Sequence, residues 1–108
     1  MPVYNKLVRD LIPDIIERDG KTCVTRILDE SAYIAEVNKK MYEELKEYEE
    51  ANTAEEHVEE LSDLLELIYA AAQFNGVTIE ELETVRQEKA KKRGAFNERI
   101  YLEEVLDD

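Results

Sequence analysis

Residues 53–76 read TAEEHVEELSDLLELIYAAAQFNG, and this stretch decides the fold. Thr53 followed three residues later by Glu56 is a capping box, which marks the start of a helix. Asn75 with Gly76 is a pattern that ends one. Because no proline or glycine interrupts the residues between them, the stretch predicts one long helix that reaches Phe74.

Similar signals predict three further helices, two before this stretch and one after it. Asp29 is an N-cap residue for a helix over about 30–50, and Thr78 begins a second capping box for a helix over about 79–93. Pro13 fits the first turn of a short helix that reaches about residue 18. We therefore predict an all-α protein, an antiparallel helical bundle with a short N-terminal helix.

One small β-ribbon is also considered. Residues 22–28, TCVTRIL, are rich in β-branched side chains and alternate in polarity, which favours a short strand. Its best partner is residues 99–104, where Ile100 and Leu102 alternate with polar neighbours. The same letters could also extend a helix, so the ribbon stays an option within the all-α prediction.

Composition limits the function. The chain has 108 residues, with 27 acidic against 14 basic side chains and a formal charge of −13. This size predicts a single domain over 1–108, and the charge disfavours binding to DNA or RNA. We find no stretch of the roughly 20 apolar residues that a membrane span needs and no signal peptide pattern, so we expect a cytoplasmic protein with no membrane partner. The single cysteine, Cys23, rules out an internal disulfide.

Most acids of the 54–74 helix are expected to face water. At about 100° per residue, the polar stripe covers a sector of roughly 60°. It is formed by Glu55, Glu59, Ser62, Glu66 and Gln73. Glu60 and Asp63 fall outside it, on either side of Leu67. These two carboxylates therefore point where the helix is otherwise apolar.

The 30–50 helix shows the same conflict. Its expected buried stripe consists of Ile34, Val37, Met41, Leu45 and Tyr48. Glu44 projects into this packed side and Glu47 lies at its margin. Four acids thus converge on the packed side of a helix pair, where each unpaired buried carboxylate would cost on the order of several kcal/mol. They need cations, either metal ions or Lys and Arg partners.

Ligand chemistry favours a hard, oxygen-seeking metal ion. Carboxylates without cysteine or clustered histidine suit Mg²⁺ or Mn²⁺. A di-iron bundle would use Glu-x-x-His pairs, but the only histidine, His57, has Ala54 three residues before it. We interpret His57 as a surface residue. The simpler alternative is that Glu44 and Glu47 are boundary residues held in salt bridges.

The spacing of these acids carries a resemblance to a known family. Glu44-Leu45-Lys46-Glu47, twelve intervening residues, and Glu60-Leu61-Ser62-Asp63 resemble the ExxE and ExxD signature of the MazG-like all-α nucleoside triphosphate pyrophosphohydrolases. The opening YNKLVRDLIP and the later KKRGAF are similar to the small subfamily described as phosphoribosyl-ATP pyrophosphohydrolase-like. The resemblance covers nearly the whole chain.

The resemblance implies a Mg²⁺-dependent enzyme, with Mn²⁺ as a substitute, that cleaves between the α- and β-phosphates of a nucleotide and releases pyrophosphate, often as house-cleaning of noncanonical nucleotides. By motif, Glu44, Glu47, Glu60 and Asp63 would be metal ligands. Glu47 and Glu60 would also be catalytic, with Glu47 a candidate general base. Phosphoribosyl-ATP is the alternative substrate, and a noncatalytic acidic helical binding module is the alternative from another class.

Basic side chains for a polyphosphate are concentrated in two places. Lys6 and Arg9 lie in the N-terminal arm, and a second group precedes Gly94. The second group includes Lys89, Lys92 and Arg93. We predict substrate contacts for all five, although Arg9 could instead pair with a nearby acid.

A second copy of the chain is the expected partner besides the nucleotide. After Leu64, the 54–74 helix is apolar over most of its circumference, which one small domain cannot easily cover. We therefore predict a homodimer or homotetramer.

Overall fold

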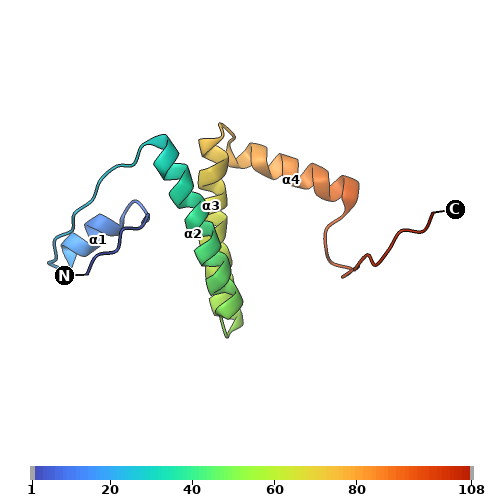
Figure 1. Ribbon diagram of the computed structural model, residues 1–108, viewed down its shortest axis with the longest axis horizontal. Helices are drawn as coiled ribbons and strands as arrows, with labels where there is room; N and C mark the ends of the chain where they lie inside the picture. The colour runs from blue at the N-terminus through green and yellow to red at the C-terminus, as the bar shows by residue number, and fades with distance from the viewer. Residues whose placement is uncertain (1, 108) are drawn as a thin grey trace.

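The computed structural model describes residues 2–107, which form four helices joined by turns and extended segments (Figure 1). The helices are α1 (Ile12–Arg18), α2 (Glu30–Glu50), α3 (Ala54–Phe74) and α4 (Ile79–Arg93). The all-α prediction is confirmed, and each helix begins and ends close to its predicted bounds.

The predicted caps set the helix starts. Asp29 Oδ1 accepts a hydrogen bond from the backbone N–H of Ala32 at 2.8 Å, and Thr53 Oγ1 accepts one from Glu56 at 3.1 Å. Thr78 caps α4 in the same way. Each such cap contributes about 1 kcal/mol to the stability of the helix that it starts.

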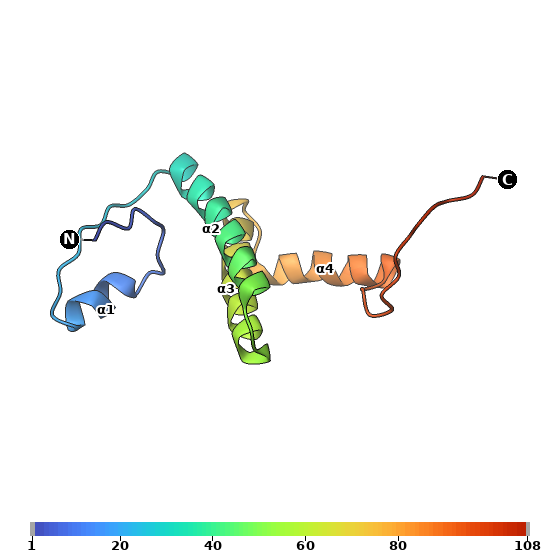
Figure 2. The ribbon, with the colours of Figure 1, turned by 60° about the horizontal axis from the view of Figure 1, so that its bottom comes forward.

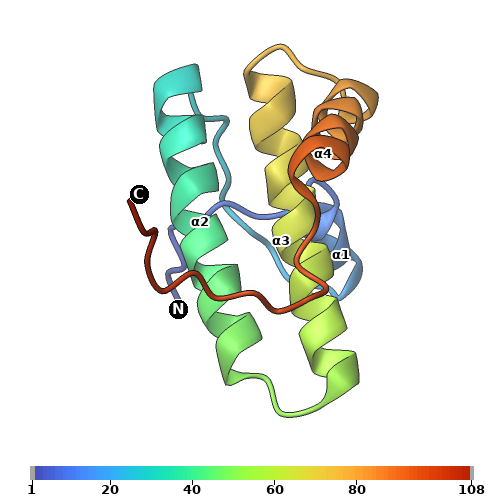
Figure 3. The same cartoon turned by 90° about the vertical axis from the view of Figure 1, so that its right-hand side faces the viewer.

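α2 and α3 form an antiparallel pair, which Figure 3 shows with the two helices side by side. At one end, the rings of Tyr33 and Phe74 lie 6.1 Å apart between centroids. At the other, Tyr48 meets His57 edge to face at 5.3 Å. Aromatic contacts therefore link the start of each helix to the end of the other.

α4 leaves this pair instead of packing along it (Figures 1 and 2). The turn that redirects the chain after α3 contains Gly76 at φ 78°, a conformation in which a side chain would be strained. α4 contacts α3 near this turn, and its far end carries Lys91, Lys92 and Arg93 away from the helix pair.

The single chain buries little of itself. Its radius of gyration is 18.7 Å, whereas a compact domain of this length has about 13 Å. Val37 on α2 is the only hydrophobic residue that is buried among residues 2–107. The predicted stripe of α2 is therefore only partly buried: Leu45 is 43% exposed, and Glu44 occupies the buried position one residue earlier.

The optional β-ribbon does not form. Residues 22–28 and 99–104 have no regular secondary structure, and they lie toward opposite ends of the molecule (Figure 1). Val24 is 101% exposed and Ile100 is 82% exposed. The segments cannot pair within one chain because the helices hold them apart.

α3 is the most apolar helix, yet acids recur along it. Among the described residues, no helix combines the length and the apolar character that crossing a bilayer requires.

Candidate metal centre

Three acidic side chains meet between α2 and α3. Glu44 and Glu47 stand one turn apart on α2, and Glu60 comes from α3. One carboxylate oxygen from each lies within 4.8 Å of the others. The antiparallel pairing creates this cluster, because the tight connection between the helices places the last turns of α2 opposite the first turns of α3.

The three carboxylates differ in their exposure to solvent. Glu44 is buried, at 7% exposure, Glu60 is half-buried and Glu47 is exposed. Glu44 Oε2 and Glu60 Oε2 are both buried without a hydrogen-bond partner among the described residues. A buried oxygen without a donor is costly, so these two atoms require a proton or a cation.

The electrostatics of the cluster favour uptake of positive charge. Burial, the neighbouring carboxyl of Glu60 and the charge of Glu47 raise the pKa of Glu44 from 4.5 to about 7. The contact with Glu44 lowers the pKa of Glu60, but the Glu47 carboxyl, desolvation and the charges of Glu47 and Asp63 together leave that pKa raised. Metal binding would relieve this repulsion as protonation does.

Asp63, the fourth predicted ligand, lies next to the cluster but faces another partner. Its charge contributes to the raised pKa values of Glu44 and Glu60, so it is electrostatically part of the site. Its Oδ1, however, accepts a hydrogen bond from Nη2 of Arg9 at 2.6 Å. The described structure therefore gathers three of the four predicted ligands and pairs the fourth with the N-terminal arm.

Glu66 is a neighbour that the sequence did not assign to the site. Its Oε1 lies 4.0 Å from Nη1 of Arg9. The helical stripe placed Glu66 on the water-facing side, and its side chain is indeed 61% exposed. The signal that would have found it is its position three residues after Asp63, which puts both acids within reach of one guanidinium.

The donor set fits a hard divalent cation. All three clustered groups are carboxylates, and two of them offer buried oxygens with no other partner. His57 takes no part: its Nδ1 lies 2.7 Å from the backbone oxygen of Thr53, and its ring packs against Tyr48. The chemistry of the cluster is therefore that of an oxygen-only site.

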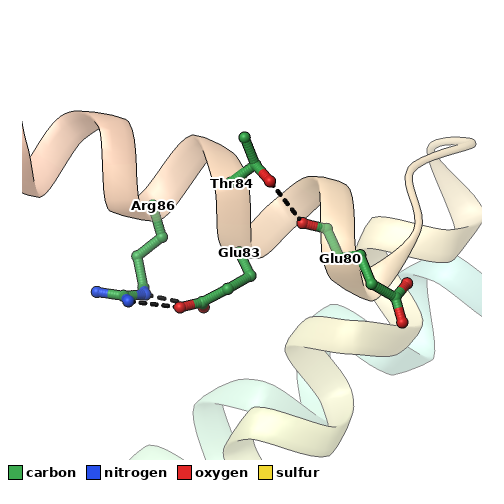
Figure 4. A network of polar contacts seen from close by, with 4 residues as sticks. All are labelled: Glu80, Glu83, Thr84 and Arg86. Atoms are coloured by element: carbon green, nitrogen blue, oxygen red, sulfur yellow. Dashed lines mark hydrogen bonds and ion pairs between the residues drawn. The ribbon is translucent and has the colours of Figure 1, made fainter.

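The other predicted phosphate contacts lie apart from the acids. Nζ of Lys6 is 5.5 Å from the ring centroid of Tyr4, within the arm itself. Lys89, Lys92 and Arg93 lie toward the far end of α4, and they form no ion pair with residues 2–107. Arg86 earlier on α4 is instead held by Glu83, with its Nε 2.9 Å from Oε2 (Figure 4).

Comparison with known proteins identifies the family. The model of the phosphoribosyl-ATP pyrophosphohydrolase family matches residues 9–90, a range that contains Arg9 and all four acids and stops before Lys92 and Arg93. No curated protein and no solved structure matched the chain. The match covers most of the sequence and agrees with the all-α fold. The chain therefore belongs to the phosphoribosyl-ATP pyrophosphohydrolase family, one of the MazG-like all-α nucleotide pyrophosphohydrolases, which are hydrolases of phosphoric anhydrides.

Proposed function

We propose that this chain is a Mg²⁺-dependent nucleoside triphosphate pyrophosphohydrolase. It would cleave the bond between the α- and β-phosphates, add water and release a nucleoside monophosphate and pyrophosphate. The observation that carries the proposal is the carboxylate cluster of Glu44, Glu47 and Glu60, with two buried oxygens lacking a partner, in a member of this family. Residues 1–108 would act as one domain.

The role that we assign to each acidic residue follows from its exposure to solvent. Glu44, Glu47 and Glu60 would hold the cation, and Asp63 would join them once released from Arg9. When bound, Mg²⁺ supplies positive charge against the phosphate oxygens and makes water more acidic. Glu47 is the exposed member of the cluster, so water and substrate can reach its carboxylate, and it is our candidate general base. Glu60 orients the reacting groups from α3.

A second copy would cover the apolar surface and complete the site. Four large apolar residues of α3 form an exposed stripe at intervals of three and four residues. They are Val58, Leu61, Leu65 and Ile68, between 64% and 37% exposed. The chain exposes 10158 Å², about 4,000 Å² more than the roughly 6,200 Å² expected for a compact monomer of 12.6 kDa. An obligate interface buries roughly 2,000–5,000 Å² counted over both partners, so the excess on one chain is more than enough to supply its half, which supports a homodimer or homotetramer.

Oligomerisation would also bring in the basic end of α4. Lys89, Lys92 and Arg93 extend away from the carboxylates of their own chain, as Figure 2 shows for α4. We propose that they meet the nucleotide phosphates at the cluster of a second copy, where Lys6 and Arg9 from the arm of that second copy also contact the phosphates.

Phosphoribosyl-ATP is the second candidate substrate. The description of the matching family favours it directly. Both candidates share the α–β anhydride and the pyrophosphate product, so the carboxylate cluster suits either. The noncatalytic binding module, by contrast, conflicts with membership of a hydrolase family. It also required all four acids to be salt-bridged, whereas Asp63 alone among them pairs with a cation in the described chain.

The test is pyrophosphate release from a panel of ordinary and modified nucleoside triphosphates and phosphoribosyl-ATP, with Mg²⁺, Mn²⁺ or EDTA. We expect release that needs the metal and falls by at least about 100-fold in Glu60→Gln. Glu59→Gln, on the exposed stripe next to it, is the matched control and should retain activity. Release from phosphoribosyl-ATP alone would select the second substrate. Metal-independent release, or full activity in Glu60→Gln, would contradict the proposal.

A further inference from the structure

Among residues 2–107, Arg9 is the one residue whose ion pairs join the N-terminal arm to the helix pair, and its closer partner is Asp63. The contact is short, at 2.6 Å between Nη2 and Oδ1, and the second guanidinium nitrogen lies 4.0 Å from Glu66. Asp63 and Arg9 remain 41% and 54% exposed, so neither is locked in place by burial. An exposed pair of this kind is weak and can exchange partners.

Arg9 holds Asp63 away from the carboxylates it was predicted to join. The three clustered acids come within 4.8 Å of one another, and Asp63 is not part of that group. Its charge nevertheless helps to raise the pKa of Glu44 and of Glu60. Asp63 stands three residues after Glu60 on α3, so the two side chains leave the helix on the same side and within one turn of each other. Arg9 is therefore the cation that pairs with the fourth carboxylate.

We propose that Arg9 is a positioning residue that competes with the divalent cation for Asp63. In the metal-free protein, Arg9 holds the Asp63 carboxylate on the arm. When the site is loaded, Asp63 exchanges Arg9 for the cation, and the freed guanidinium turns to the phosphates of the nucleotide. This inference rests on the proposed function, because it takes the carboxylate cluster as a cation site.

The exchange predicts opposite effects of one substitution on two ligands. Arg9→Gln removes the competitor, so Mn²⁺ alone should bind about two- to fivefold more tightly, the range expected for the loss of an exposed ion pair. The same change removes a phosphate contact and should raise the KM for the nucleotide. A purely structural role for Arg9 would weaken both. Arg9→Lys keeps the charge and should restore most of the wild-type behaviour.

The experiment is a calorimetric titration of the protein with Mn²⁺. The KM for the nucleotide is measured separately. Arg18→Gln at the end of α1 removes the same charge without touching Asp63 and is the matched control. In an Asp63→Asn background, Arg9→Gln should no longer change the Mn²⁺ affinity. Unchanged or weaker Mn²⁺ binding in Arg9→Gln, or an equal gain in Arg18→Gln, would overturn the inference.

Failure of the proposed function has a different signature. If the wild-type chain binds no Mn²⁺, or if Glu60→Gln leaves the binding unchanged, the cluster is not a cation site and the inference falls with it. If Glu60→Gln abolishes binding while Arg9→Gln changes nothing, the metal site stands and only the competition by Arg9 is wrong.

Discussion

The carboxyl groups of Glu44 and Glu60 meet across the α2–α3 pair, and each keeps one oxygen buried without a hydrogen-bond partner. Burial of Glu44, the neighbouring carboxyl of Glu60 and the charge of Glu47 together raise the pKa of Glu44 to about 7. Binding of either a proton or a metal ion would therefore stabilise these two carboxyl groups.

The first prediction concerns pH without metal. Because the pKa of Glu44 in the folded chain, about 7, lies above its ordinary value of 4.5, the folded chain binds a proton more strongly than the unfolded chain. The stabilisation of the fold by this bound proton is complete below about pH 4.5 and is lost as the pH rises through 7. Glu44→Gln mimics the protonated group. At pH 8 in EDTA, the free energy of unfolding of this variant should therefore exceed that of the wild type by on the order of 2 kcal/mol.

Urea unfolding at pH 5 and pH 8, at one fixed protein concentration, measures this difference. Glu43→Gln, the exposed neighbour on α2, is the control and should follow the wild type. A Glu44→Gln variant that is less stable than the wild type at pH 8 would show that the carboxylate is stabilised by a partner in the folded protein.

The second prediction concerns stability in metal. A ligand that binds only the folded state at 100 times its Kd adds about 2.7 kcal/mol. We expect Mg²⁺ or Mn²⁺ to raise the melting temperature of the wild type at pH 8, and EDTA to reverse the rise. Glu60→Gln should lose it. An equal rise in Glu60→Gln would place the cation elsewhere on this acidic surface.

Local chemistry made the helices predictable. Thr53, Thr78 and Asp29 carry the start signals in their own side chains, and each accepts the expected hydrogen bond. The ribbon was not predictable in this way, because alternation in residues 22–28 says that a strand would be stable once paired but not whether a partner strand is within reach.

The site was predictable to the level of helix faces. Periodicity placed Glu60 off the polar stripe and Glu44 on the packed side, and both carry a buried oxygen. Periodicity says nothing of which partner a side chain takes, so it could not choose between a metal site and an ion pair for Asp63. That choice depends on where the arm brings Arg9, a contact across 54 residues.

The third prediction separates Glu47 from its neighbours. Because Glu47 is the exposed member of the cluster, Glu47→Gln should leave the fold intact and change the stability by less than about 1 kcal/mol. Loss of a general base should lower kcat by about 100-fold or more. Circular dichroism checks the fold and pyrophosphate release checks kcat. Wild-type kcat in this variant would remove Glu47 from the catalytic role.

The fourth prediction tests the exposed stripe of α3. Leu65 is 44% exposed at its centre, so Leu65→Glu places a charge in the proposed interface. We expect the molar mass from light scattering to fall toward that of a 12.6 kDa monomer, whereas Leu65→Met, which preserves volume, should keep the assembly. A monomeric wild type would contradict the proposal of a second copy.

The last prediction asks whether the basic end of α4 acts on another copy. Glu60→Gln damages the carboxylate cluster, and the double substitution Lys89→Gln with Arg93→Gln damages the α4 end. If each site combines the carboxylates of one copy with α4 of another, a mixed dimer has one intact site and one doubly damaged site. Random mixing makes half of the dimers mixed, so about a quarter of the wild-type sites should return.

Co-expression of the two variants, followed by an assay of pyrophosphate release, measures this recovery. Each variant alone should be nearly inactive, and mixing two preparations of the same variant is the control. If α4 served its own chain, every site in a mixed dimer would carry one defect and no activity would return. The geometry favours recovery, because α4 leaves the helix pair that holds the carboxylates and carries its cations outward (Figure 1).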